Sequence, residues 1–226
     1  MSYIKKILAG VLILAMMLGL VVAGEASSPT DVPTSANPNY DPATGNDTET
    51  AQNGVQVVFH INSDGTSTIT SVQQSQGTTG TSVNAYGGYD ENGNYVPAAQ
   101  VGDGKHGVLN SKLGQKITTF AVNNGDNQVT INANAFKGSK VKTVKINGKK
   151  VKIKKNAFKG TKQKTVKIYV KKAKKATDVS VAKGAFNGLS SKSKIYVSKK
   201  NMSKKEYNKL VKKLRKAGFK GKVVRN

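Results

Sequence analysis

A motif that returns three times in the C-terminal half of the chain constrains the fold more than any other feature of the sequence. Each copy begins with the valine of a short β-rich run and continues to Asn-Ala-Phe or Gly-Ala-Phe and a glycine, at residues 129–138, 151–160 and 179–188. The phenylalanine always follows that valine by seven residues, and the three phenylalanines are 22 and 28 residues apart. This spacing is close to the roughly 20–29 residues of a leucine-rich repeat. The sequence therefore predicts a solenoid, whose units bury their apolar faces by stacking on one another.

A second β-rich run follows each copy, at residues 141–146, 164–170 and 194–197. Valine or isoleucine alternates with lysine in these runs, which is typical of a strand with one buried face and one face in water. The glycine two residues after each phenylalanine suits a turn that needs a positive φ. An earlier, degenerate copy at residues 117–122 aligns with residues 141–146. The array is thus expected to hold about three and a half units.

This order of strand, Asn-Ala-Phe and glycine resembles the BspA-like leucine-rich repeat proteins of bacterial surfaces, over about residues 115–226. The resemblance implies a mainly β fold, with a short leucine-rich-repeat-like solenoid at residues 115–198 and a C-terminal cap helix and strand at residues 199–226. It also implies adhesion to other cells or to matrix proteins, without naming the ligand.

Residues 201–220 are predicted to form the capping helix. Ser203 is placed as the N-cap, and Glu206 is placed to complete a capping box with it. Gly218 and Phe219 fit a Schellman stop. A basic amphipathic helix can instead act on a membrane surface. We favour the cap, because an open solenoid needs a terminal cap.

The N-terminus predicts export. Residues 1–26 have the basic start, apolar core and small residues of a signal peptide, with cleavage after Ala23 or Ala26. An uncleaved anchor is the alternative, since the apolar run is not far short of a bilayer span. The chain has no cysteine, which excludes disulfides and a lipid-bearing thiol. We expect a protein that is secreted or held noncovalently at the cell surface.

Two further segments precede the array. Residues 27–53 hold four of the five prolines and little apolar content, and are predicted to be a disordered linker or stem. Residues 54–114 are predicted to be a small β-rich module or an N-terminal cap. Within them, residues 55–61 and 66–72 flank an Asn-Ser-Asp-Gly sequence and predict a β-hairpin.

Charge is the main clue to function. Residues 24–128 carry three lysines and ten acids, a net charge of −7, whereas residues 129–226 carry 32 basic side chains and two acids, a net charge of +30. A field of this size attracts polyanions. The alternative is that alternating lysines only keep strands soluble, but a small domain needs a net charge of only about 2–8 for that purpose.

The densest basic clusters are the candidate binding residues: Lys149, Lys150, Lys152, Lys154, Lys155, Lys171, Lys172, Lys174 and Lys175. Because lysine is a hydrated point charge, broad binding is expected. The expected partners are an anionic cell-wall polymer, an acidic glycan or a surface protein. Nucleic acid is expected only nonspecifically, since the basic runs lack interleaved aromatic residues. Membrane contact is a less favoured partner, and a membrane-active basic protein that works through the C-terminal helix is the alternative function.

The sequence gives little support for an enzyme. His60 and His106 are its two histidines, and neither lies in a recognisable catalytic motif. Residues 90–94 are similar to the start of a calcium loop, but the glycine is misplaced and no glutamate stands at the twelfth position, so a hairpin turn is favoured. A hydrolase within residues 54–114 lacks motif support. No catalytic residue, metal ligand or cofactor is predicted.

Overall fold

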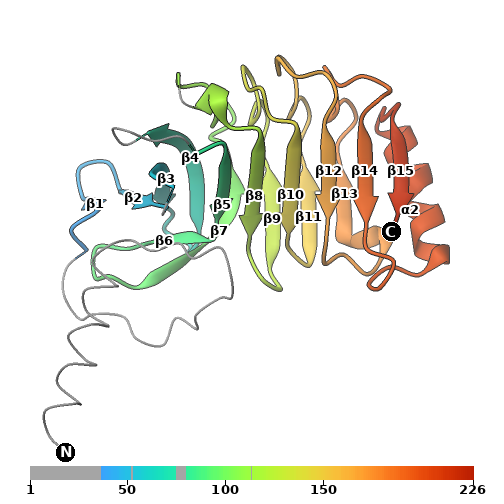
Figure 1. Cartoon of the computed structure of the whole chain (residues 1–226). Helices are drawn as coiled ribbons and strands as arrows, with labels where there is room; N and C mark the ends of the chain where they lie inside the picture. The colour runs from blue at the N-terminus through green and yellow to red at the C-terminus, as the bar shows by residue number, and fades with distance from the viewer. Residues whose placement is uncertain (1–36, 52, 75–79, 113) are drawn as a thin grey trace, which may run out of the picture.

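The computed structural model describes residues 37–226 apart from 52, 75–79 and 113. This part of the chain is mainly β, with two open sheets and a single α-helix, α2 (Lys204–Lys216), at its C-terminal end (Figure 1). The predicted signal peptide at residues 1–26 lies outside the described residues. Within the described ranges, no helix is long and apolar enough to cross a bilayer.

Two sheets contain all the strands of these ranges. The first, sheet A, has the order β1 (Tyr40–Asp41), β2 (Asn46–Thr50), β3 (Val55–Ile61), β4 (Ser67–Gln74), β7 (Tyr95–Val101), β9 (Gln128–Ile131), β11 (Lys150–Ile153) and β13 (Val179–Val181), with β6 (Gly87–Tyr89) paired to β7. The second, sheet B, has the order β5 (Ser82–Ala85), β8 (Thr119–Asn123), β10 (Thr143–Asn147), β12 (Lys167–Val170), β14 (Lys194–Val197) and β15 (Lys222–Arg225). Short 3₁₀ turns are η1 (Gly114–Lys116) and η2 (Ala176–Asp178).

The motif copies align in space as they do in the sequence. In sheet A, β9, β11 and β13 pair in parallel, with the first valine of each copy in one register row: Val129, Val151 and Val179. In sheet B, β8, β10, β12 and β14 also pair in parallel, and β8 takes the register expected of the degenerate earlier copy. Figure 1 shows these strands side by side along the length of the array. In β10 and β11, alternating valine or isoleucine and lysine buries one face of the strand and leaves the other toward water. β8 and β9 have no lysine, and Ala121 and Thr130 are buried as well.

The core lies between the two sheets. The motif phenylalanines are buried there, and each ring contacts the next at centroid distances of 5.0 and 6.2 Å: Phe136, Phe158 and Phe186. Phe120 and Phe219 extend the column at its two ends. One continuous apolar cluster contains these rings and reaches from β3 to β15. A single copy cannot bury its own phenylalanine, so the packing depends on neighbouring copies.

Backbone geometry explains the polar and glycine positions of the motif. Asn134 and Asn156 have φ values of 58° and 62°, and Gly184 takes the same left-handed conformation in the third copy. Asparagine is among the few residues with a side chain that tolerate this region, and glycine has no penalty there. The glycine after each phenylalanine also has a positive φ, as predicted, at Gly138, Gly160 and Gly188.

Residues 37–51, within the segment expected to be a disordered linker, instead contain strands. β2 pairs antiparallel with β3, and β1 pairs with β2. Asp47 is buried in β2, where its carboxylate accepts hydrogen bonds from the Asn37 side-chain amide at 2.8 Å and from the Tyr89 backbone N–H at 2.9 Å. These bonds to distant residues satisfy a polar segment that has too little apolar content to predict a strand.

Residues 54–114 continue directly into the repeats. The predicted hairpin is confirmed, since β3 and β4 pair antiparallel. The turn at residues 90–94 also joins a hairpin, formed by β6 and β7. Beyond it, β7 pairs with β9 and β5 pairs with β8, both in parallel. Both sheets thus run without a break from this region into the motif copies.

The helix α2 is shorter than the predicted 201–220, because its caps lie inside that range. The Ser203 hydroxyl accepts a hydrogen bond from the Glu206 backbone N–H. The Schellman stop is confirmed: Phe219 N–H donates to the Leu214 carbonyl, and Gly218 N–H donates to the Arg215 carbonyl. The reciprocal half of the capping box is absent, because the Glu206 carboxylate accepts instead from the Ala176 backbone N–H at 2.9 Å. This contact joins the helix to η2.

Candidate polyanion-binding surface

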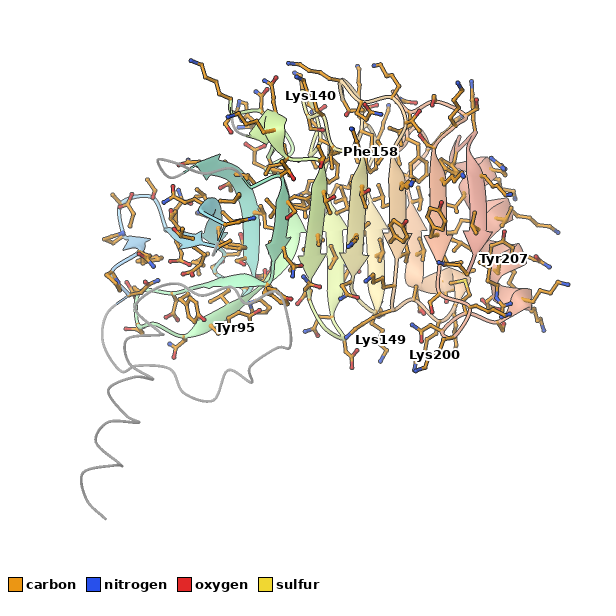
Figure 2. All side chains as sticks on the ribbon, viewed as in Figure 1. Tyr95, Lys140, Lys149, Phe158, Lys200 and Tyr207 are labelled. Atoms are coloured by element: carbon orange, nitrogen blue, oxygen red, sulfur yellow. The ribbon has the colours of Figure 1, made fainter. Side chains whose placement is uncertain are left out.

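Strand geometry and turns direct the predicted lysines outward. β11 alternates exposed Lys150 and Lys152 with buried Val151 and Ile153. Figure 2 shows Lys149 and Lys200 at one edge of the array and Lys140 at the opposite edge. The lysines therefore occupy distinct surfaces, which the order of the strands defines.

The edge at which β10, β12 and β14 end collects six of the nine predicted lysines. The connections that leave these strands lie next to one another, because β12 pairs with β10 on one side and with β14 on the other. Neighbouring strands are about 4.8 Å apart, so consecutive connections bring their side chains close together. We call this surface the basic edge and define it as Lys149, Lys150, Lys171, Lys172, Lys174, Lys175, Lys199 and Lys200. All are exposed except Lys172, which is half-buried.

The acids near the basic edge are already engaged. The Asp178 carboxylate accepts hydrogen bonds from the backbone N–H groups of Lys174 and Lys175, at 2.9 and 2.8 Å. Asp126 lies 3.5 Å from the Lys172 ammonium. Within residues 129–226, all of which are described, only Lys172 and Lys209 form ion pairs. The eight lysines of the edge outnumber these two acids, so the edge keeps a net positive charge.

Glu206 is the second of the two acids within residues 129–226, and its carboxylate also forms structural hydrogen bonds. The hydrogen bond from the Lys209 ammonium, at 2.8 Å, and the one from the Ala176 N–H lower its pKa below the usual value for glutamate. Glu206 is therefore ionised over a wide pH range. It joins η2 to α2 and pairs with Lys209 of the helix.

The remaining three predicted lysines lie on the outer face of sheet A. Lys152, Lys154 and Lys155 line a shallow depression of about 380 Å³, together with Ser180 of β13. Its floor is apolar, with Ile153, Val181, Ala133 and Ala182. The predicted cluster 149–155 is thus split by the fold, with two lysines on the basic edge and three around this depression.

The outer face of sheet B holds a group that the sequence interpretation overlooked. Three lysines stand in one register row on adjacent strands, and we call them the lysine row: Lys167, Lys194 and Lys222. Two residues along, the rings of Tyr169 and Tyr196 stack with centroids 4.6 Å apart and planes 8° apart. Aromatic residues do interleave with lysines here. The signal was present in the sequence, since Lys-Ile-Tyr-Val occurs at both 167–170 and 194–197.

The two histidines lie away from these surfaces. His60 is exposed, with Nδ1 3.2 Å from the Asn46 side-chain oxygen, and His106 is exposed with Nδ1 2.9 Å from the Asp103 carboxylate. Among residues 37–226, the masked positions aside, no group of three or more potential metal-ligating side chains comes together.

No protein-family model, curated protein or solved structure matches this chain.

Proposed function

We propose that this chain is a secreted, nonenzymatic surface-binding or adhesion protein whose lysine-rich array binds anionic polymers or surfaces. In this proposal residues 115–198 form a short leucine-rich-repeat-like solenoid similar to the BspA-like proteins, and residues 199–226 cap it. The parallel register of the copies and the continuous phenylalanine column support the solenoid. Residues 1–26 direct export, so the polymers that the protein meets are those of a cell surface or its surroundings.

The observation that carries the proposal is the net positive charge of the basic edge. Three successive connections place eight lysines along one border of the array, and only Lys172 has an acidic partner there. Like charges held at this spacing repel one another, and an anionic chain laid along the edge relieves that repulsion. Lysine contacts have little shape specificity, so the edge suits several polyanions, including wall polymer and acidic glycan.

The alternative function, membrane disruption through α2, has less support. Leu210 and Leu214, which form the apolar face of the helix, are buried in the core cluster. The helix must leave the array before this face can meet a lipid bilayer. Leakage of anionic liposomes by the intact chain would favour this alternative over the surface-binding proposal.

A matched pair of variants tests the proposal in the exported chain, residues 27–226. The first changes five lysines of the basic edge to glutamine: Lys149, Lys150, Lys171, Lys174 and Lys175. The control removes the same charge from the opposite side of the array: Lys137, Lys140, Lys142, Lys159 and Lys162. Binding to teichoic acid, polyuronate and polyphosphate is measured by titration over a range of salt concentrations.

We expect the wild-type affinity to fall steeply with salt for every polymer, because association releases counterions. The basic-edge variant should bind all three polymers more weakly and with a shallower salt dependence than the control. Equal losses in the two variants would remove the edge as the binding surface. Wild-type binding that is insensitive to salt would overturn the electrostatic proposal itself.

A further inference from the structure

We infer that the outer face of sheet B is a separate binding site for a linear acidic polysaccharide with one carboxylate per sugar, lying across the strands. This inference rests on the proposed polyanion binding and adds to it a ligand class and a second surface. The lysine row and both tyrosines lie outside the basic edge, and Lys171 is the one residue of the edge that also lines this face. The face combines three features: the lysine row, a polar depression and a chain of hydrogen bonds between side-chain amides. A surface that bound polyanions by charge alone would require only the first.

The lysine row forms a line of positive charge across three adjacent strands. Lys167, Lys194 and Lys222 are exposed and occupy one register row on β12, β14 and β15. Adjacent strands are about 4.8 Å apart, which is close to the length of one pyranose residue. A polymer running across the strands turns about its own axis from one sugar to the next, so some of its carboxylates face the row and meet its lysines.

Without a bound anion, repulsion between the three lysines of the row lowers the stability of sheet B. Like charges directly opposite one another on paired strands destabilise a sheet. No acid of the described chain forms an ion pair with any lysine of the row. A bound carboxylate polymer removes this repulsion, so binding and folding of sheet B are coupled, and the polymer is expected to raise the melting temperature.

Next to the charge row, the face has a polar depression of about 340 Å³. It forms where the small side chain of Ala121 lies between Asn84 on β5 and Lys145 on β10. Lys171 and Tyr86 also line it. Lys145, which lines the depression, stands in register with Tyr169 on the next strand.

A chain of amides forms one wall of the depression. The Asn147 side-chain N–H donates to Asn123 at 2.8 Å, Asn123 donates to Asn84 at 2.7 Å, and Asn84 donates to the Tyr86 hydroxyl at 2.8 Å. Within the described chain, the ends of this series have no further partner: the Asn147 side-chain oxygen accepts no hydrogen bond, and the Tyr86 O–H has no acceptor. A free acceptor and a free donor at fixed positions suit the hydroxyl groups of a sugar.

The tyrosine geometry separates this ligand from nucleic acid. Binding of single strands relies on bases that stack on exposed aromatic faces. Tyr169 and Tyr196 instead stack on each other, and their outer faces are flanked in register by Lys145 and Val224. Little ring face is left for a base, whereas hydroxyl and carboxylate groups can still meet the surrounding amides and lysines.

Three variants of the exported chain test the inference, each first checked for a cooperative melting transition. The row variant changes Lys167, Lys194 and Lys222 to glutamine. The control changes three lysines of another surface, Lys140, Lys142 and Lys162, to glutamine. The third variant, Tyr86→Phe, keeps all charges and removes the hydroxyl, which is the free donor and also the acceptor for the Asn84 amide. The probes are oligogalacturonate and oligophosphate of matched charge, titrated at physiological salt.

The inference predicts that wild type binds oligogalacturonate more tightly than oligophosphate. The row variant should lose about tenfold or more in oligogalacturonate affinity and the control clearly less. Tyr86→Phe should lower oligogalacturonate affinity by about two- to tenfold, as for one hydrogen bond, and leave oligophosphate binding unchanged.

Equal affinity of wild type for the two probes, or equal losses in the row variant and the control, would overturn the inference while the basic edge stands. An unchanged oligogalacturonate affinity in Tyr86→Phe would also overturn the role of the depression. Failure of wild type to bind either probe would overturn the inference and the proposed function together.

Discussion

Phe136 and Phe158 stack nearly face to face, with ring centroids 5.0 Å apart and planes 17° apart. They come from equivalent positions of two motif copies, so the 22-residue spacing in the sequence becomes one step along the core. Phe186 adds the next step at 6.2 Å. The rings of successive copies are therefore buried by one another, and each depends on its neighbours for its place in the core.

The first prediction removes the middle ring. Phe158→Ala deletes a fully buried side chain and two aromatic contacts, and should lower the free energy of unfolding by about 3–5 kcal/mol. Lys159→Ala, at the exposed neighbouring position, is the control and should change it by less than about 0.5 kcal/mol. Urea unfolding measures both. A Phe158→Ala curve that overlays the wild type would contradict the role given to the column.

The second prediction concerns the left-handed backbone of the motif. At Asn156, with φ 62°, alanine should destabilise the chain by about 1–2 kcal/mol relative to glycine, because a Cβ is disfavoured in this region. Both substitutions lose the bond that the Asn187 amide donates to the Asn156 side chain, so their difference isolates the backbone term. Thermal unfolding of the two variants checks the order. Greater stability of the alanine variant would mean that the left-handed geometry is not retained.

The third prediction uses pH. Burial and the neighbouring negative charge of Asp47 raise the pKa of Glu49 to about 7. Between pH 4.5 and 7 the folded chain therefore keeps a proton that the unfolded chain has lost, and the free energy of unfolding should fall as pH rises through this range. Glu49→Gln should flatten that part of the profile. Asp64→Asn, in an exposed turn, should leave it unchanged, and an unaltered slope in Glu49→Gln would reject the assignment.

The fourth prediction concerns the start of α2. Ser203→Ala removes the acceptor for the Glu206 N–H and should cost about 1 kcal/mol. Ser203→Asp restores a side-chain acceptor at the N-cap and should recover most of this loss. Denaturant unfolding with helix content followed by circular dichroism distinguishes the two. A stable Ser203→Ala chain would indicate that Glu206, through Ala176, positions the helix without the N-cap.

The repeat copies, the hairpin at residues 55–61 and 67–74, and the caps of α2 are predictable because their signals are local. Each needs only a period, a turn sequence or a capping residue within a few positions. The strand β2 is not predictable in this way, because Asp47 is satisfied by Tyr89, 42 residues away in the sequence. Glu206 likewise forms its bond with Ala176 rather than closing the local capping box.

The candidate surfaces likewise combine features that are visible in the local sequence with features that depend on the fold. Dense lysine runs are visible in the sequence, but their separation into the basic edge and the depression of sheet A depends on where each strand ends. The lysine row and the stacked tyrosines depend on the parallel register of β12 with β14, which joins residues 27 positions apart. The repeated Lys-Ile-Tyr-Val tetrapeptide predicts the lysine row and the tyrosine stack only if the two strands that contain it are known to pair residue for residue.

In sheet A, β11 pairs in parallel and in register with a motif strand on each side, β9 and β13. We therefore expect that a further copy inserted at the middle position would leave β7 paired with the first motif strand and α2 against the last copy. Each added copy would extend the surface by a similar amount. It would bring one more buried phenylalanine, one more strand in each sheet and one more group of exposed lysines. The number of motif copies would therefore set the length of this part of the chain.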